Sequence, residues 1–126
     1  MTSPVYHAES SVRLFGGRVE DYLPIHQWFD ESSSHCADCR HRVYRHHTLG
    51  IAESVREFGP YLLIVDKGRE RRVPVHYIGN QHCLEDMACV PTLQDWIAGM
   101  QIKSWMQRGR PVQRRCDLTR TAEVSV

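Results

Sequence analysis

Apolar residues recur along most of the chain with helical spacing, and one segment has the pattern of a β-hairpin. The longest helical pattern runs from about Ser34 to Phe58, where the apolar positions are separated by seven, seven, four and three residues. Gly59-Pro60 is a strong helix stop, so the pattern predicts one long central helix that ends there. The apolar stripe of this helix consists of Ala37, Tyr44, Ile51, Val55 and Phe58.

The segment after Pro60 predicts the hairpin. Residues 61–65 and 72–78 have the composition of strands, and Asp66-Lys67-Gly68 lies between them as a turn. Pro74 places the second strand at a sheet edge, because proline has no backbone N–H to donate to a neighbouring strand.

Shorter helices are predicted on both sides of these elements. Residues 10–17 (SSVRLFGG) predict a short helix closed by two glycines, and residues 20–34 predict a helical turn or two near Pro24. Asn80 can cap another short helix over residues 81–88.

The C-terminal part divides into a helix and a tail. Thr92 and Asp95 form a capping box at the start of an amphipathic pattern over residues 91–106. Residues 107–126 have no periodicity and few large apolar residues, which predicts a basic, flexible tail. We therefore expect an α+β fold, with a long central helix, a β-hairpin and several short helices, in one globular domain over residues 1–106.

Composition narrows the class of protein. The chain has 126 residues, of which 41% are hydrophobic and 25% charged, as in a soluble single-domain protein. No apolar run approaches the roughly 18 residues that a membrane span needs, and the N-terminal segment does not have the pattern of a signal peptide. The five cysteines form an odd set, which suits free thiols, and we expect a cytoplasmic protein.

Charge is unevenly distributed. Residues 1–102 carry ten Lys/Arg and thirteen Asp/Glu, a net charge of −3, whereas residues 103–126 carry six and two, a net charge of +4. A near-neutral body argues against a dedicated DNA-binding domain. The basic tail could contact a nucleic acid through its phosphates.

The stretch from His35 to His47, HCADCRHRVYRHH, is rich in groups that bind metals or anions. On the predicted helix His41 and His47 flank the apolar stripe, so each is partly buried and needs a metal, a carboxylate or a backbone carbonyl as partner. Structural histidines beside a solvated charged face are the alternative. The CxxC of Cys36 and Cys39 is weak evidence for zinc, because no second CxxC follows.

A second group of candidate ligands follows in the sequence NQHCLED. His82 stands three residues before Glu85 and four before Asp86, so a helix presents all three on one side, as in helical metal sites. A local salt bridge has the same spacing. His26 and Asp30 repeat the pattern, and it is the convergence of these groups that suggests a site.

These segments also resemble a known family. HAESSVRLFGG, DYLPIHQWFDES, DCRHRVYRHHTLGI, VPVHYIGNQHCLED and PTLQDW are similar to an uncharacterised family of small bacterial and phage proteins, classed as a domain of unknown function, over residues 7 to 106. The resemblance implies no activity, but it implies importance for the histidines, Asp30, Asp38 and the Glu85-Asp86 pair. The family has an aromatic residue where this chain has Cys39 and a lysine where it has Ser33, which weakens a role for the CxxC.

We therefore predict a small metal-binding protein with a His/carboxylate pocket. The expected cofactor is a divalent metal, zinc in the first place, and its predicted ligands are His41, His47, His82 and Asp86. An open coordination position would make the protein a metal-dependent hydrolase of a phosphoester or nucleotide. Glu85 would then be the general base, and Arg42 and Arg45 would contact the anionic substrate.

The alternative is a protein without enzymatic activity. A phage or mobile-element accessory protein that binds an anionic small molecule, such as a nucleotide signal, or that inhibits a host protein complex would also have a small size and a charged pocket. Arg40, Arg42 and Arg45 could clamp such an anion without any metal.

Overall fold

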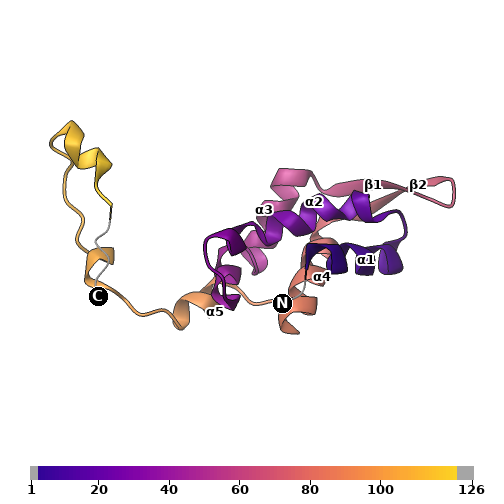
Figure 1. The fold of residues 1–126 in the computed structure, drawn as a ribbon, viewed down its shortest axis with the longest axis horizontal. Helices are drawn as coiled ribbons and strands as arrows, with labels where there is room; N and C mark the ends of the chain where they lie inside the picture. The colour runs from indigo at the N-terminus through magenta and orange to yellow at the C-terminus, as the bar shows by residue number, and fades with distance from the viewer. Residues whose placement is uncertain (1–2, 122–126) are drawn as a thin grey trace.

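The computed structural model describes residues 3–121 and has the predicted α+β architecture. Helices α1 (Pro4–Phe15) and α2 (Val19–Phe29) form a helical hairpin, beside which α4 (Val75–Met87) packs (Figure 1). The β-hairpin projects from one end of this body, and the C-terminal segment leaves it at the other.

The first helix confirms the prediction for SSVRLFGG and extends it toward the N-terminus. Ser3 caps α1 by accepting a hydrogen bond from the Tyr6 N–H, and Pro4 occupies the first turn, where no intrahelical donor is needed. The helix ends at Gly16, whose φ of +86° is readily adopted only by glycine. Tyr22 of α2 donates a hydrogen bond to the Gly16 carbonyl at 2.6 Å, which secures the connection between the two helices.

The prediction of one long central helix over residues 34–58 is wrong. A 3₁₀ segment, η1 (Glu31–Ser34), ends where the predicted helix begins, and a second one, η2 (Cys39–Tyr44), lies between turns and bends in its first half. Only its second half is α-helical, as α3 (Thr48–Phe58). The stop at Gly59 is confirmed, because the helix ends there.

Local hydrogen bonds explain the interruption. The Asp38 carboxylate accepts from the Arg40 N–H and starts η2 as a new turn. His47 has extended backbone dihedrals and caps α3, since its Nδ1 accepts from the Gly50 N–H at 3.0 Å. The chain then folds back so tightly that a Cβ on Gly50 would lie 1.9 Å from the Arg45 carbonyl oxygen. These polar side chains compete with helical hydrogen bonds, a competition that the apolar stripe does not reveal.

The β-hairpin is confirmed. Strands β1 (Tyr61–Asp66) and β2 (Arg69–Pro74) pair antiparallel around Lys67-Gly68, which both have the positive φ of a two-residue hairpin turn. The second strand ends at Pro74 instead of residue 78, because α4 begins at the next residue.

The hydrophobic core lies between α1, α2, α3, α4 and the inner face of the hairpin. Its fully buried apolar members are Ala8, Tyr22, Ile25, Phe29, Ile51, Ile64, Val73, Val75, Ile78 and Cys83. The helix predicted over residues 81–88 is thus the second half of a longer helix that supplies both core and polar residues.

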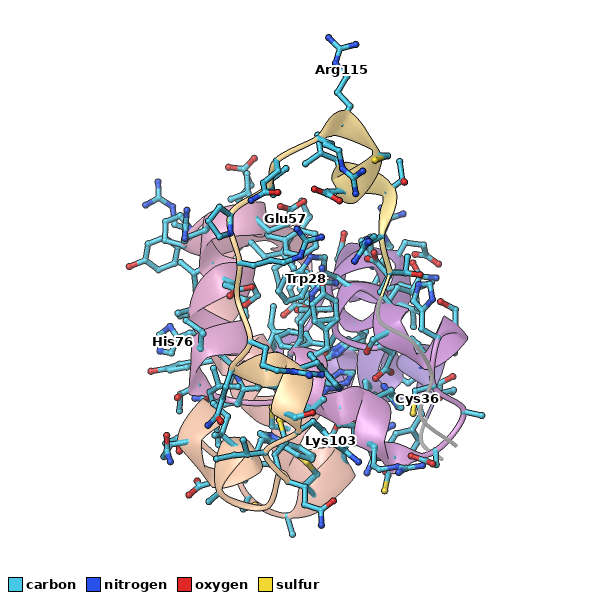
Figure 2. All side chains as sticks on the ribbon, turned by 90° about the vertical axis from the view of Figure 1, so that its left-hand side faces the viewer. Trp28, Cys36, Glu57, His76, Lys103 and Arg115 are labelled. Carbon is cyan, nitrogen blue, oxygen red and sulfur yellow. The ribbon has the colours of Figure 1, made fainter. Side chains whose placement is uncertain are left out.

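The C-terminal segment is less compact. The capping box of Thr92 and Asp95 is confirmed at the start of α5 (Leu93–Ala98), but this helix ends at Ala98 and not near residue 106. All residues from 97 to 116 are exposed, and Arg115 points outward at the tip of the segment (Figure 2). The domain boundary at residue 106 stays a prediction, and residues 122–126 of the predicted tail lie outside the described residues.

Within residues 3–121, no helix combines the length and the apolar character that crossing a membrane requires.

Candidate metal centre

Six of the eight histidines are buried, which is unusual for a polar side chain and requires a partner for each ring. Four of their rings lie together at the centre of the helical body: the His7 and His82 ring centroids are 4.1 Å apart, those of His26 and His82 5.2 Å, and those of His46 and His82 4.8 Å. His41 and His47 are buried nearby.

Four side chains of this region could hold a metal ion. His7 comes from α1, Asp30 from the C-terminal end of α2, and His82 and Asp86 from successive turns of α4. One ligand atom from each lies within 4.8 Å of the other three. We refer to these residues as the metal group.

The atoms of the metal group face one another directly. His7 Nε2 lies 3.0 Å from Asp86 Oδ1, and His82 Nε2 lies 3.2 Å from Asp30 Oδ1 and 3.3 Å from Asp86 Oδ2. Both histidine side chains are fully buried and Asp86 is 2% exposed, whereas Asp30 is 13% exposed. The centre is therefore shielded from water except near Asp30.

Hydrogen bonds behind His7 orient its ring. His7 Nδ1 lies 2.8 Å from Glu85 Oε1, and because an ionised carboxylate only accepts, Nδ1 carries the hydrogen. Burial alone would lower the pKa of His7, but hydrogen bonds with Asp86 and Glu85 raise it, so a second proton on Nε2, which faces Asp86, is favoured without a metal ion. An ion at the metal group would take the place of this proton and use the Nε2 lone pair. Glu85 also accepts from Ser10 and, at 2.9 Å, from Gln81 Nε2. A carboxylate behind a ligating histidine is a common outer partner in metal sites.

A hydrogen-bond chain orients His82 in the same way. The Ser11 hydroxyl donates to Gln81 Oε1 at 2.7 Å, so its oxygen accepts from His26 Nε2 at 2.8 Å. Neutral His26 then accepts at Nδ1 from His82 Nδ1, 2.9 Å away. His82 Nε2 is then the ring atom that faces the metal group, and in the neutral ring it carries the lone pair. Burial, together with the neighbouring His82 and His7, lowers the pKa of His26 to about 2, which agrees with the neutral ring that this chain requires.

The carboxylates of the centre are ionised. Burial alone would raise the pKa of Asp86, but hydrogen bonds with His46, His7 and His82 hold it well below its usual range. Burial alone would also raise the pKa of Asp30, but hydrogen bonds with His46 and His82 lower it. The negative charge of these two groups favours a cation at the centre.

His46 approaches the same carboxylates from the segment before α3. Its Nε2 lies 2.9 Å from Asp86 Oδ2 and 3.4 Å from Asp30 Oδ1, and its side chain is fully buried. Its Nδ1 has no hydrogen-bond partner among residues 3–121. Trp96 of α5 donates to the His46 carbonyl at 2.9 Å, which links the position of this segment to the C-terminal helix.

The structure brings together only some of the predicted ligands. His82 and Asp86 lie in the metal group, at the helical spacing from which they were predicted. Both ring nitrogens of His47 contact backbone groups, Gly50 N–H at Nδ1 and the Val43 carbonyl at Nε2, so this side chain caps a helix. His41 is 4% exposed and lies outside the metal group, and its Nε2 has no hydrogen-bond partner in the part of the chain that the structure describes.

The two arginines predicted to contact a substrate lie apart. Arg42 lies beside the centre: its Nη2 is 3.8 Å from Asp86 Oδ1, and its Nη1 donates to the Asp86 carbonyl at 3.4 Å. The Arg45 guanidinium stacks 3.9 Å over the Trp28 ring and donates to the Trp28 carbonyl and to Glu31. Only Arg42 is therefore placed to act at the centre.

Sequence reasoning missed His7, Asp30 and His46 as members of the centre. The family resemblance implied importance for Asp30 and the histidines without giving them a role, and the residues themselves suggested Asp30 only as the partner of His26 in a helical pair. The residues of α1 that face the interior include His7, Ser10 and Ser11, and a helix with polar residues on its buried face would have been the sign of a polar site.

The cysteines lie outside the metal group, and all five are free thiols. Cys39 is exposed and Cys36 is half-buried in the loop between η1 and η2, at the edge of the molecule in Figure 2. We expect the double substitution Cys36→Ser and Cys39→Ser to leave the metal content unchanged, because neither sulfur faces the metal group. Elemental analysis of the purified variant beside the wild type checks this, and a loss of metal would identify the CxxC as a ligand pair.

Comparison with known proteins gives a family without a function. Residues 2–106 match the model of a family described as a domain of unknown function (DUF6915). No curated protein and no solved structure is significantly similar to the chain. The matched segment covers most of the chain and contains the whole metal group, so this protein belongs to the DUF6915 family.

Proposed function

We propose that this protein binds a divalent transition metal ion at the metal group, and that the ion is zinc. One observation carries the proposal: ligand atoms of His7, Asp30, His82 and Asp86, drawn from three helices, lie within 4.8 Å of one another inside the protein. A core that needed only satisfied histidines would not require two ionised carboxylates at the same point.

The orientation of the rings supports a cation at this position. The hydrogen bonds with Glu85 and His26 occupy the Nδ1 atoms of His7 and His82, so their Nε2 atoms are the ones that can bind an ion, and both Nε2 atoms face carboxylate oxygens at 3.0–3.3 Å. A lone pair and a carboxylate at this distance repel each other unless a proton or a metal ion lies between them. Neutral imidazole held by an outer hydrogen bond is the form in which histidine binds metals.

The set of donor atoms suits zinc. Two imidazole nitrogens and two carboxylate oxygens give four ligands, the number found in most zinc sites, and the absence of sulfur disfavours softer ions such as Cu(I). An ion held between α1, α2 and α4 would also stabilise the packing of these helices, because the unfolded chain cannot offer the same four ligands together.

Metal analysis tests the proposal. Purified full-length protein should contain at least one equivalent of zinc, or should take it up after treatment with a chelator, with a rise in melting temperature. The measurements are elemental analysis, calorimetric titration with zinc and thermal melting. Protein that takes up no metal and melts at the same temperature with and without zinc would exclude this function.

A metal-dependent hydrolase of a phosphoester or nucleotide is the activity that fits this centre. The observation that favours it is the exposed edge: Asp30 is 13% exposed and Arg42 15% exposed, so a ligand can approach the ion where a positive charge is available. His7, Asp30, His82 and Asp86 would hold the ion, which would supply Lewis-acid activation of a water molecule for hydrolysis, and Arg42 would contact the phosphate oxygens. Turnover of a chromogenic phosphodiester by the zinc-loaded protein checks this activity. Nucleotide binding without turnover would favour the non-enzymatic alternative.

A further inference from the structure

Several polar atoms at one corner of the centre are buried without a partner. Among the described residues these atoms are His41 Nε2, Arg42 Nε, Arg45 Nε and His46 Nδ1, all in the short stretch from His41 to His46. Arg45 differs from the other three because its guanidinium stacks over the Trp28 ring and does not contact the metal group. Buried polar groups are nearly always hydrogen-bonded, so the three unpaired atoms beside the metal group point to a group that binds there.

Arg42 and His46 lie beside the carboxylates of the metal group, and His41 lies beside His46. Arg42 and His46 both contact Asp86, at 3.8 Å and 2.9 Å, and His46 also approaches Asp30. The His41 ring lies 5.8 Å from the His46 ring, at a right angle to it. His41 is held in place because the Ser32 hydroxyl donates to its carbonyl at 2.8 Å.

The chemistry of the unpaired atoms selects the ligand. Arg42 Nε carries a hydrogen under all ordinary conditions and can only donate, so its partner must be an acceptor. A second metal ion cannot accept a hydrogen bond, and it would be repelled by the guanidinium. An unpaired imidazole nitrogen that carries a hydrogen can donate to the same kind of acceptor. The several free oxygens of a phosphate group can accept from Arg42 and from neighbouring imidazoles together, whereas a carboxylate offers only two oxygens.

We infer that His41, Arg42 and His46 form a phosphate-binding seat beside the metal ion, which would hold the phosphate group of the substrate or ligand. The inference rests on the proposed metal centre for its place in the function, since the seat adjoins Asp30 and Asp86. The inference gives Arg42 a direct contact with the phosphate group. It gives His41 a role in anion binding in place of its predicted role as a metal ligand.

Titration of zinc-loaded, full-length protein with inorganic phosphate tests the seat. Wild type should bind phosphate, and Arg42→Gln and His41→Asn should each weaken binding at least about tenfold, as expected for the loss of a hydrogen bond to a charged group. The zinc content of both variants should stay unchanged. Arg45→Gln is the matched control, because this arginine lies on the same segment but stacks on Trp28, and it should bind phosphate like the wild type. Acetate in place of phosphate should bind more weakly.

A second measurement needs no variant, in case a substitution impairs folding. With Co²⁺ in place of zinc in the wild-type protein, the ³¹P resonance of added phosphate should broaden strongly, because the seat places phosphorus close to the paramagnetic ion. Absence of broadening, or equal loss of binding in Arg45→Gln and Arg42→Gln, would overturn the seat. Failure of the metal centre itself is recognised separately by the absence of metal uptake. Phosphate binding to such metal-free protein that is lost in Arg42→Gln would still support the seat.

Discussion

Asp86→Asn is expected to lose zinc affinity by at least about 100-fold, more than the loss usual for an outer partner of a metal ligand. Asp86 is the carboxylate that His7, His46 and His82 all contact, and its side chain is 2% exposed. Asparagine keeps the size of the side chain but removes its negative charge and replaces one acceptor oxygen with a donor. The histidines and Arg42 would then face an uncharged amide in the interior.

The same substitution should lower the stability of the fold. Removal of one partner from a buried ion pair typically costs about 3–5 kcal/mol, because the other charge stays buried without compensation. Calorimetric titration with zinc and thermal melting measure the two effects. Glu57→Gln is the control, because it changes the net charge by the same amount at an exposed position of α3. Unchanged zinc affinity in Asp86→Asn would rule out this residue as a ligand.

Gly50→Ala is expected to lower the free energy of unfolding by about 3 kcal/mol or more, at the upper end of the range for overpacking. In an ordinary helix this change would stabilise the protein by roughly 1 kcal/mol, because alanine has the higher helix propensity. Here the added Cβ would lie 1.9 Å from the Arg45 carbonyl oxygen, which is backbone and cannot rotate away. The chain between the two residues includes His46 and His47, so relief of the clash would also move His46 from the metal centre.

Denaturant unfolding of Gly50→Ala measures this effect. Gly99→Ala is the matched control, because Gly99 also lies at a helix end, has a negative φ, and its added Cβ would have its nearest contact at 3.8 Å. The control should unfold within about 0.5 kcal/mol of the wild type. An equally small effect at Gly50 would show that the segment before α3 does not pack as described.

The parts of the fold that were predicted correctly depend on residues close together in the sequence. The hairpin follows from a two-residue turn between strand-forming segments, and α5 begins where Thr92 and Asp95 cap each other. His82 and Asp86 could be paired because a helix of any origin places residues four apart on one side. Each of these features is decided within a few positions of the chain.

The failed prediction of a long central helix has a related cause. Its apolar stripe was correct for the part that became α3, but the periodicity of apolar residues says nothing about backbone hydrogen bonds taken over by Asp38 and His47. His47 was read as a metal ligand for the same reason, since its place beside the apolar stripe predicted burial without revealing its partner. In the structure that partner is the backbone of α3 itself.

The sequence by itself determined the α+β class, the hairpin, the ends of several helices and one half of the metal group. The tertiary structure alone decided that His7 and Asp30 join His82 and Asp86, and that His46 and Arg42 lie beside them. His7 and Asp86 are 79 positions apart, and no local spacing connects them. His7 and Asp86 meet because the polar faces of α1 and α4 are buried against each other. The packing of the surrounding apolar faces sets the distance between their ligand atoms.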